Sequence, residues 1–192
     1  MFFANPKTGT TALETALLPH ATIAISDDPD LKHIGVKRFE RDVQPFLKKV
    51  GIESKLDSFG VMRDPIDWLG SWYRYRQRDY DIGTEHSTRH VSFDDFACAY
   101  LDKENRPIFA KIGSPLGILH REGGKIGVDH LYAYEDLDLL VKELSQRLNT
   151  ELSIKARINA SPQLALELRN ETREKLEHRF KKDIAIYAEI KR

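Results

Sequence analysis

The chain has 192 residues, of which 41% are apolar and 31% are charged, and 30 basic side chains balance 30 acidic ones. This composition is typical of a single globular domain spanning 1–192, and the zero net charge argues against a nucleic-acid partner, because general nucleic-acid binders carry a basic excess. We find no apolar run of about 18 residues that would predict a membrane span and no signal peptide, so we expect a cytoplasmic protein without a membrane partner.

The N-terminal quarter predicts strands that alternate with helices. Phe2 to Ala4 is a short apolar strand, and Leu13, Ala16 and Leu17 then recur at helical spacing. The β-branched residues of 21–25 predict a second strand. A helix is expected over 43–50, closed by a glycine at position 51.

The middle of the chain continues this pattern. Phe59 to Met62 is a strand candidate, and Asp64-Pro65 has the signature of an N-cap followed by proline at the first helical position. The helix that follows runs through Arg76. The polar stretch 79–90 predicts a mobile loop.

A capping box of Ser92 and Asp95 starts the next predicted helix. Cys98 falls in its apolar pattern, so we expect a buried structural thiol. Residues 106–125 carry no clear pattern. Further elements are expected as a strand at 128–134 and helices at 137–148, 171–182 and 184–190. Strands alternating with helices predict an α/β fold with a central parallel sheet flanked by helices.

The segment Asn5-Pro6-Lys7-Thr8-Gly9-Thr10-Thr11 joins the first predicted strand to the first helix. A glycine allows close backbone approach, and the helix start presents unpaired N–H groups and the positive end of the helix dipole. Two threonine hydroxyls and a lysine add donors. The segment therefore predicts a phosphate or sulfate site; the alternative is a capped helix start with chance hydroxyls.

The nucleoside-triphosphate version of such a loop reads GxxxxGK[ST], with lysine after the last glycine. Here Lys7 precedes Gly9, and no Gly-Lys-Ser/Thr triplet occurs in the chain. The missing triplet counts against a P-loop kinase or nucleotide-binding phosphotransferase, which stays open as an alternative function. A non-catalytic nucleotide-binding protein is a further alternative.

Two motifs resemble those of sulfotransferases that use 3′-phosphoadenosine 5′-phosphosulfate (PAPS). The stretch from Pro6 to Thr11 resembles their 5′-phosphosulfate loop. The sequence Val61-Met62-Arg63-Asp64-Pro65, with Ser71 eight residues after Arg63, is similar to their 3′-phosphate motif. The resemblance implies a three-layer P-loop-type fold, PAPS as sulfo donor, and a donor site of Pro6, Lys7, Thr8, Gly9, Thr10, Thr11, Arg63 and Ser71.

Two further segments extend the resemblance. Residues 134–137, Tyr-Glu-Asp-Leu, are similar to a late strand–helix step in many sulfotransferases. Residues 157–161 resemble a C-terminal segment of carbohydrate-type members, although a turn with local side-chain hydrogen bonds is an equal alternative. The Arg-Lys-Gly segment of the cytosolic aryl and steroid enzymes does not occur.

The resemblance implies transfer of a sulfo group to a hydroxyl or amine of a small-molecule or carbohydrate acceptor. Lys7 would neutralise charge on the donor, and no metal is required; no cluster with metal-ligand spacing is seen. A general base is useful, and His33, which follows the predicted strand at 21–25 after a short polar turn, is the closest match in order along the chain. A histidine that only packs or is solvated is the alternative, and His86, His90 and His130 are weaker candidates.

Overall fold

The computed structural model describes residues 1–52, 56–154 and 166–191, which form two compact units. Unit 1 comprises Met1–Met62, Leu116–Ile158 and Lys191. Unit 2 comprises Arg63–Pro115 and Asn159–Ile190.

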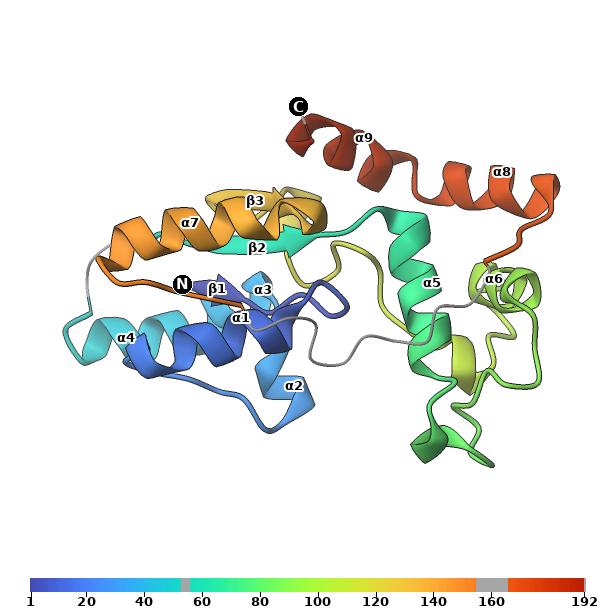
Figure 1. The fold of residues 1–192 in the computed structure, drawn as a ribbon, viewed down its shortest axis with the longest axis horizontal. Coiled ribbons are helices and arrows are strands. Elements are labelled where there is room, and N and C mark those ends of the chain that lie inside the picture. The colour runs from blue at the N-terminus through green and yellow to red at the C-terminus, as the bar shows by residue number, and fades with distance from the viewer. Residues whose placement is uncertain (53–55, 155–165, 192) are drawn as a thin grey trace. The chain divides into compact units, whose positions relative to one another are not determined.

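Unit 1 is built on a small parallel sheet. Strands β1 (Phe2–Phe3), β2 (Phe59–Met62) and β3 (His130–Ala133) lie side by side in the order β1-β2-β3 (Figure 1). Both pairings are parallel. The strands predicted at the start of the chain, at 59–62 and at 128–134 are therefore confirmed, as is the parallel sheet.

One face of this sheet is covered by helices α1 (Thr10–Leu17) and α7 (Leu137–Leu148). Leu13 of α1 and Leu140 of α7 pack in one core cluster with Phe59 and Val61 of β2. Phe59 and Val61 point to the same face because side chains alternate along a strand. The helical spacing of apolar residues predicted both helices.

The opposite face carries a second helical layer. Phe3 packs edge-on against Phe39, with ring centroids 5.5 Å apart, and a side chain at Gly60 would collide with Leu119. Phe39 belongs to a continuous helical run made of α3 (Val36–Arg38), the π-helical segment η2 (Phe39–Val43) and α4 (Gln44–Lys49). Helices therefore pack on both faces of the sheet, and unit 1 has a mixed α/β architecture.

Two predictions in this unit need correction. The strand expected at 21–25 is wrong: the segment is irregular and exposed between η1 (Leu18–His20) and α2 (Pro29–Lys32). Ile23 is 59% exposed, so its alternating pattern has no sheet to pack against. The helix expected at 43–50 is present as α4, but the helical run that contains it begins earlier, at Val36. The π segment lies directly before Pro45, whose missing N–H would interrupt the hydrogen bonds of a regular α-helix.

Unit 2 is helical in the part that the structure describes. Its helices are α5 (Pro65–Tyr75), α6 (Phe93–Leu101), α8 (Asn170–Arg179) and α9 (Lys181–Ile190). Its core cluster includes Trp68 of α5, Phe96 of α6, and Leu176 with the adjoining Phe180. Besides η1, the 3₁₀ turns in the described residues are η3 (Asp79–Asp81), η4 (Ile108–Ala110), η5 (Glu122–Gly124) and η6 (Tyr134–Asp136), the last two in unit 1.

Both predicted N-caps in unit 2 are confirmed. The Asp64 carboxylate accepts hydrogen bonds from the amides of Ile66 and Asp67, each at 2.9 Å. The Ser92 hydroxyl oxygen accepts from the Asp95 amide at 3.1 Å. These bonds satisfy N–H groups that a helix start leaves without intrahelical partners.

The segment 79–90, expected to be a mobile loop, is anchored by buried polar side chains. Thr88 is 0% exposed, and its hydroxyl donates to the Tyr73 carbonyl at 2.8 Å. Asp81 and Arg76 are also buried. Burial lowers the pKa of the Arg76 guanidinium, and the nearby Asp81 charge acts in the opposite direction.

Cys98 is exposed on α6, so the expectation of a buried thiol is wrong. Its sulfur lies 3.6 Å from the Thr172 hydroxyl. The neighbouring Ala97 takes the buried position that the apolar pattern of the helix provides. Within the described ranges, no helix is long and apolar enough to cross a membrane.

Candidate functional site

The loop that follows β1 is tied to the neighbouring strand. The Asn5 side-chain amide donates to the Val61 carbonyl at 3.0 Å, close to the carboxyl end of β2. The Thr8 hydroxyl donates to the Asn5 carbonyl at 2.7 Å, and both residues are buried. The Thr8 side chain therefore closes the loop on itself, which leaves its backbone amide as the group suited to a ligand.

Two residues of the loop adopt left-handed backbone conformations. Lys7 has φ 68° and Gly9 has φ 77°. Lysine seldom adopts this region, and such strained residues concentrate at ligand sites. Gly9 is the N-cap of α1, whose first turn carries no acidic side chain. The positive end of the helix dipole is therefore not compensated by an acid from its own first turn.

Gly9 also lies against the strand–helix step after β3. A Cβ atom at this position would lie 3.0 Å from a Leu137 methyl and 3.3 Å from the Tyr134 ring. The segment at 134–137, noted in the sequence for its resemblance, thus packs on the loop glycine. Only a residue without a side chain fits here without displacement of its neighbours.

We expect Gly9→Ala to destabilise the chain more than Gly51→Ala. Both glycines have positive φ, which costs an alanine about 1–2 kcal/mol, but a Cβ at Gly51 meets no atom within 4 Å. Gly9→Ala adds the contacts with Leu137 and Tyr134 to the same backbone strain. Urea unfolding of the two variants measures the difference, and equal losses of free energy would contradict the described packing.

His33 is held at the base of the loop. Its Nδ1 lies 2.5 Å from the carbonyl oxygen of Ala4, the residue before Asn5. A carbonyl oxygen can only accept, so Nδ1 carries the proton and Nε2 has the lone pair in neutral His33. The adjacent Lys32 forms an ion pair with Glu14 of α1 at 2.6 Å. These contacts place His33 beside the loop, as its position in the sequence led us to expect.

His130 lies elsewhere in unit 1. It is the first residue of β3, at the amino end of the parallel sheet, and pairs with Asp57 at 2.8 Å. The loop that follows β1 leaves the sheet at the opposite, carboxyl edge. His86 and His90 belong to unit 2, where both are exposed. In unit 1, His33 is therefore better placed than His130 for chemistry at the loop.

Arg63 is the residue directly after β2, and its Nε donates to the Asp67 carboxylate. Arg74 donates to the other Asp67 oxygen at 3.2 Å. The sequence reading missed Asp67 as a partner, although the i, i+4 spacing from Arg63 is the signal of such a pair. The carboxylate between the two arginines fixes the orientation of both guanidinium groups. Ser71 is 5% exposed, within α5.

The loop in unit 1 has several features that favour anion binding. It combines backbone amides at a helix start, a lysine in the same turn and a neighbouring histidine whose Nε2 can accept a proton. In the described part of the chain, no three His, Cys, Asp or Glu side chains lie close enough together to hold a metal ion. The segment 157–161, compared above with carbohydrate-type enzymes, lies outside the described residues.

Comparison with known proteins gives no relative. No protein-family model, curated protein or solved structure matches the chain.

Proposed function

We propose that the chain is a PAPS-dependent sulfotransferase with a P-loop-type, three-layer fold. The observation that carries the proposal is the loop from Asn5 to Thr11: a left-handed lysine and a left-handed glycine at the start of a helix that follows the first strand of a parallel sheet. This arrangement binds phosphate-like groups in proteins. The order of Lys7 and Gly9 matches the sulfotransferase loop rather than the nucleoside-triphosphate loop.

Each loop residue has a role in the proposed donor site. Pro6 and the hydrogen bond from Thr8 to Asn5 shape the turn. The amides of Thr8, Gly9, Thr10 and Thr11 hold the 5′-phosphate, and Lys7 stabilises the negative charge that develops on the leaving phosphate. His33 accepts the proton of the attacking hydroxyl or amine at Nε2. The bound PAPS supplies the sulfo group.

Arg63 and Ser71 are proposed to bind the 3′-phosphate of the donor. The pairing of Arg63 Nε with Asp67 fixes the orientation of the side chain, and a guanidinium group is suited to bind phosphate oxygens with charge-assisted hydrogen bonds. Arg63→Ala should weaken binding of adenosine 3′,5′-bisphosphate by about 1.5–3 kcal/mol, or about ten- to a hundredfold. Isothermal titration calorimetry measures this loss.

The control ligand for Arg63→Ala is adenosine 5′-phosphate, which lacks the 3′ group. Its affinity should change much less. Equal losses for both nucleotides would show that Arg63 does not recognise the 3′-phosphate.

Sulfo transfer itself is tested with radiolabelled PAPS and a panel of hydroxylated and amine acceptors, both carbohydrates and other small molecules. The proposal expects label to move to at least one acceptor with the native chain and to fall strongly with Lys7→Ala. Tight donor binding with no transfer to any acceptor would favour a non-catalytic nucleotide-binding protein instead.

A further inference from the structure

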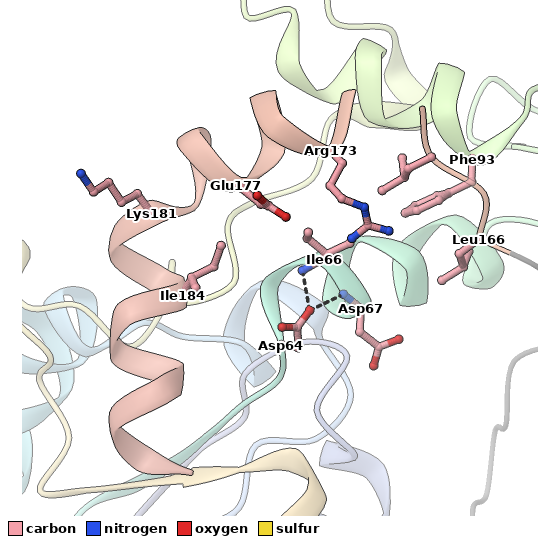
Figure 2. Close-up of a pocket in the computed structure, with 10 residues that line it drawn as sticks. Asp64, Ile66, Asp67, Phe93, Leu166, Arg173, Glu177, Lys181 and Ile184 are labelled. Atoms are coloured by element: carbon pink, nitrogen blue, oxygen red, sulfur yellow. Dashed lines mark hydrogen bonds between the residues drawn. The ribbon is translucent and has the colours of Figure 1, made fainter. Parts of the chain in front are cut away.

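Unit 2 contains a pocket whose lining residues all belong to that unit. Its volume is about 580 Å³, which lies within the usual range for small-molecule sites, about 300–1,000 Å³. Its residues come from the start of α5, from Phe93 of α6, from the segment before α8, and from α8 and α9 (Figure 2). None of them belongs to the loop 5–11 or is His33.

Much of the pocket wall is apolar. The lining residues of this kind are Ile66, Phe93, Leu166, Leu168 and Ile184. Phe93 is buried in the core of unit 2, and Leu166, Leu168 and Ile184 pack against that core while remaining partly exposed. An apolar ligand group in this space would remove their exposed surface from water, which favours binding.

The acidic groups on the α5 side of the pocket already have partners. The Asp64 carboxylate accepts from two backbone amides at the helix start. Asp67 is paired with Arg63 and Arg74. This side of the pocket therefore presents carboxylates whose charge is compensated within the protein.

Arg173 and Glu177 of α8 differ from Asp64 and Asp67 in their interactions within the protein. They lie one turn apart, and Figure 2 shows both side chains directed into the pocket, whereas Lys181 points away from it. Neither Arg173 nor Glu177 forms an ion pair within the described ranges 1–52, 56–154 and 166–191. The pocket thus offers one planar donor and one acceptor next to an apolar wall.

From this arrangement we infer that the pocket binds a small organic acid with an apolar body and a hydrogen-bond donor beside its carboxylate. The guanidinium of Arg173 only donates and matches a carboxylate with two parallel hydrogen bonds. The carboxylate of Glu177 only accepts, so it requires an ammonium or hydroxyl donor on the ligand. α-Amino and α-hydroxy acids with apolar side chains have all three features.

The test uses the full chain and four probes that differ by one feature. L-phenylalanine and L-3-phenyllactate carry the ring, the carboxylate and an amino or hydroxyl donor. Hydrocinnamate lacks the donor, and 2-phenylethylamine lacks the carboxylate. We expect saturable binding of at least one of the first two in calorimetry or NMR titration, and binding at least about tenfold weaker for the other two. The better of the first two probes identifies the ligand as an amino acid or a hydroxy acid.

Variants of the two charged residues locate the site. Arg173→Gln should weaken binding of the preferred probe at least about tenfold, and Glu177→Gln should reduce its advantage over hydrocinnamate. Lys182→Gln and Glu189→Gln are matched controls, because both residues are exposed on α9 and neither lines the pocket. The controls should bind like the native chain.

The inference would be overturned if neither donor-bearing acid saturates the native chain up to about 10 mM, or if Arg173→Gln binds the preferred probe as well as the native chain does. It does not depend on the proposed sulfo transfer. Titration of the same samples with adenosine 3′,5′-bisphosphate separates the two, since Arg173→Gln should leave nucleotide affinity unchanged.

Discussion

Lys7→Ala is expected to lower the rate of sulfo transfer by about 10²–10³, the usual effect of removing one donor that stabilises charge in a transition state. Negative charge grows on the leaving phosphate as the sulfo group departs, and Lys7 lies in the turn that holds this phosphate in the proposed complex. Donor affinity should fall less than the rate, because the amides of the loop remain. Steady-state kinetics together with calorimetry of adenosine 3′,5′-bisphosphate measures both effects.

The left-handed backbone of Lys7 calls for a second variant, Lys7→Gly. Glycine adopts φ 68° without strain, so this variant should be at least as stable as Lys7→Ala while lacking the same charge. Equal rate losses in both variants would assign the effect to the ammonium group. Recovery of activity in Lys7→Gly, or near-native turnover in Lys7→Ala, would remove the lysine charge from the mechanism.

His33→Ala should lose at least about 10² in rate, the usual size of general-base catalysis, while donor affinity stays near native. The hydrogen bond from Nδ1 to the Ala4 carbonyl leaves Nε2 as the nitrogen that can take the acceptor's proton. Steady-state rates of the native chain and the variant, together with calorimetry of adenosine 3′,5′-bisphosphate, test this assignment.

His33→Gln is the informative control, because its side-chain amide can retain a donor toward Ala4 but cannot accept a proton at neutral pH. It should be as inactive as His33→Ala. A His33→Gln variant with native turnover would limit His33 to a packing role on Ala4.

Parts of the fold could be predicted because local chemistry determines them. Asp64-Pro65 and Ser92 with Asp95 are strong helix-start signals, and both predicted caps are present. The short strand at 59–62 was readable from its continuous apolar run, as expected for a strand buried on both faces. His33 lies beside the loop as predicted, although the strand at 21–25 on which that prediction rested is an irregular, exposed segment.

Other features depend on contacts that no short stretch of sequence encodes. The apolar residues Ile23 and Ile25 alternate like a strand, but both are exposed and pair with none of the described strands. Cys98 occupies an exposed position of α6 because Ala97 and Phe96 take the buried ones. The pocket around Arg173 combines residues from positions 64 to 184, so only the tertiary structure reveals it.

The proposed function rests most directly on which nucleotide the native chain binds. Calorimetric titration should compare adenosine 3′,5′-bisphosphate with ATP in the presence of Mg²⁺ and with adenosine 5′-phosphate. The proposal predicts that the 3′,5′-bisphosphate binds at least about tenfold more tightly than either of the others, a difference of about 1.4 kcal/mol or more. Preferential binding of ATP with Mg²⁺, or no binding of the 3′,5′-bisphosphate, would contradict it.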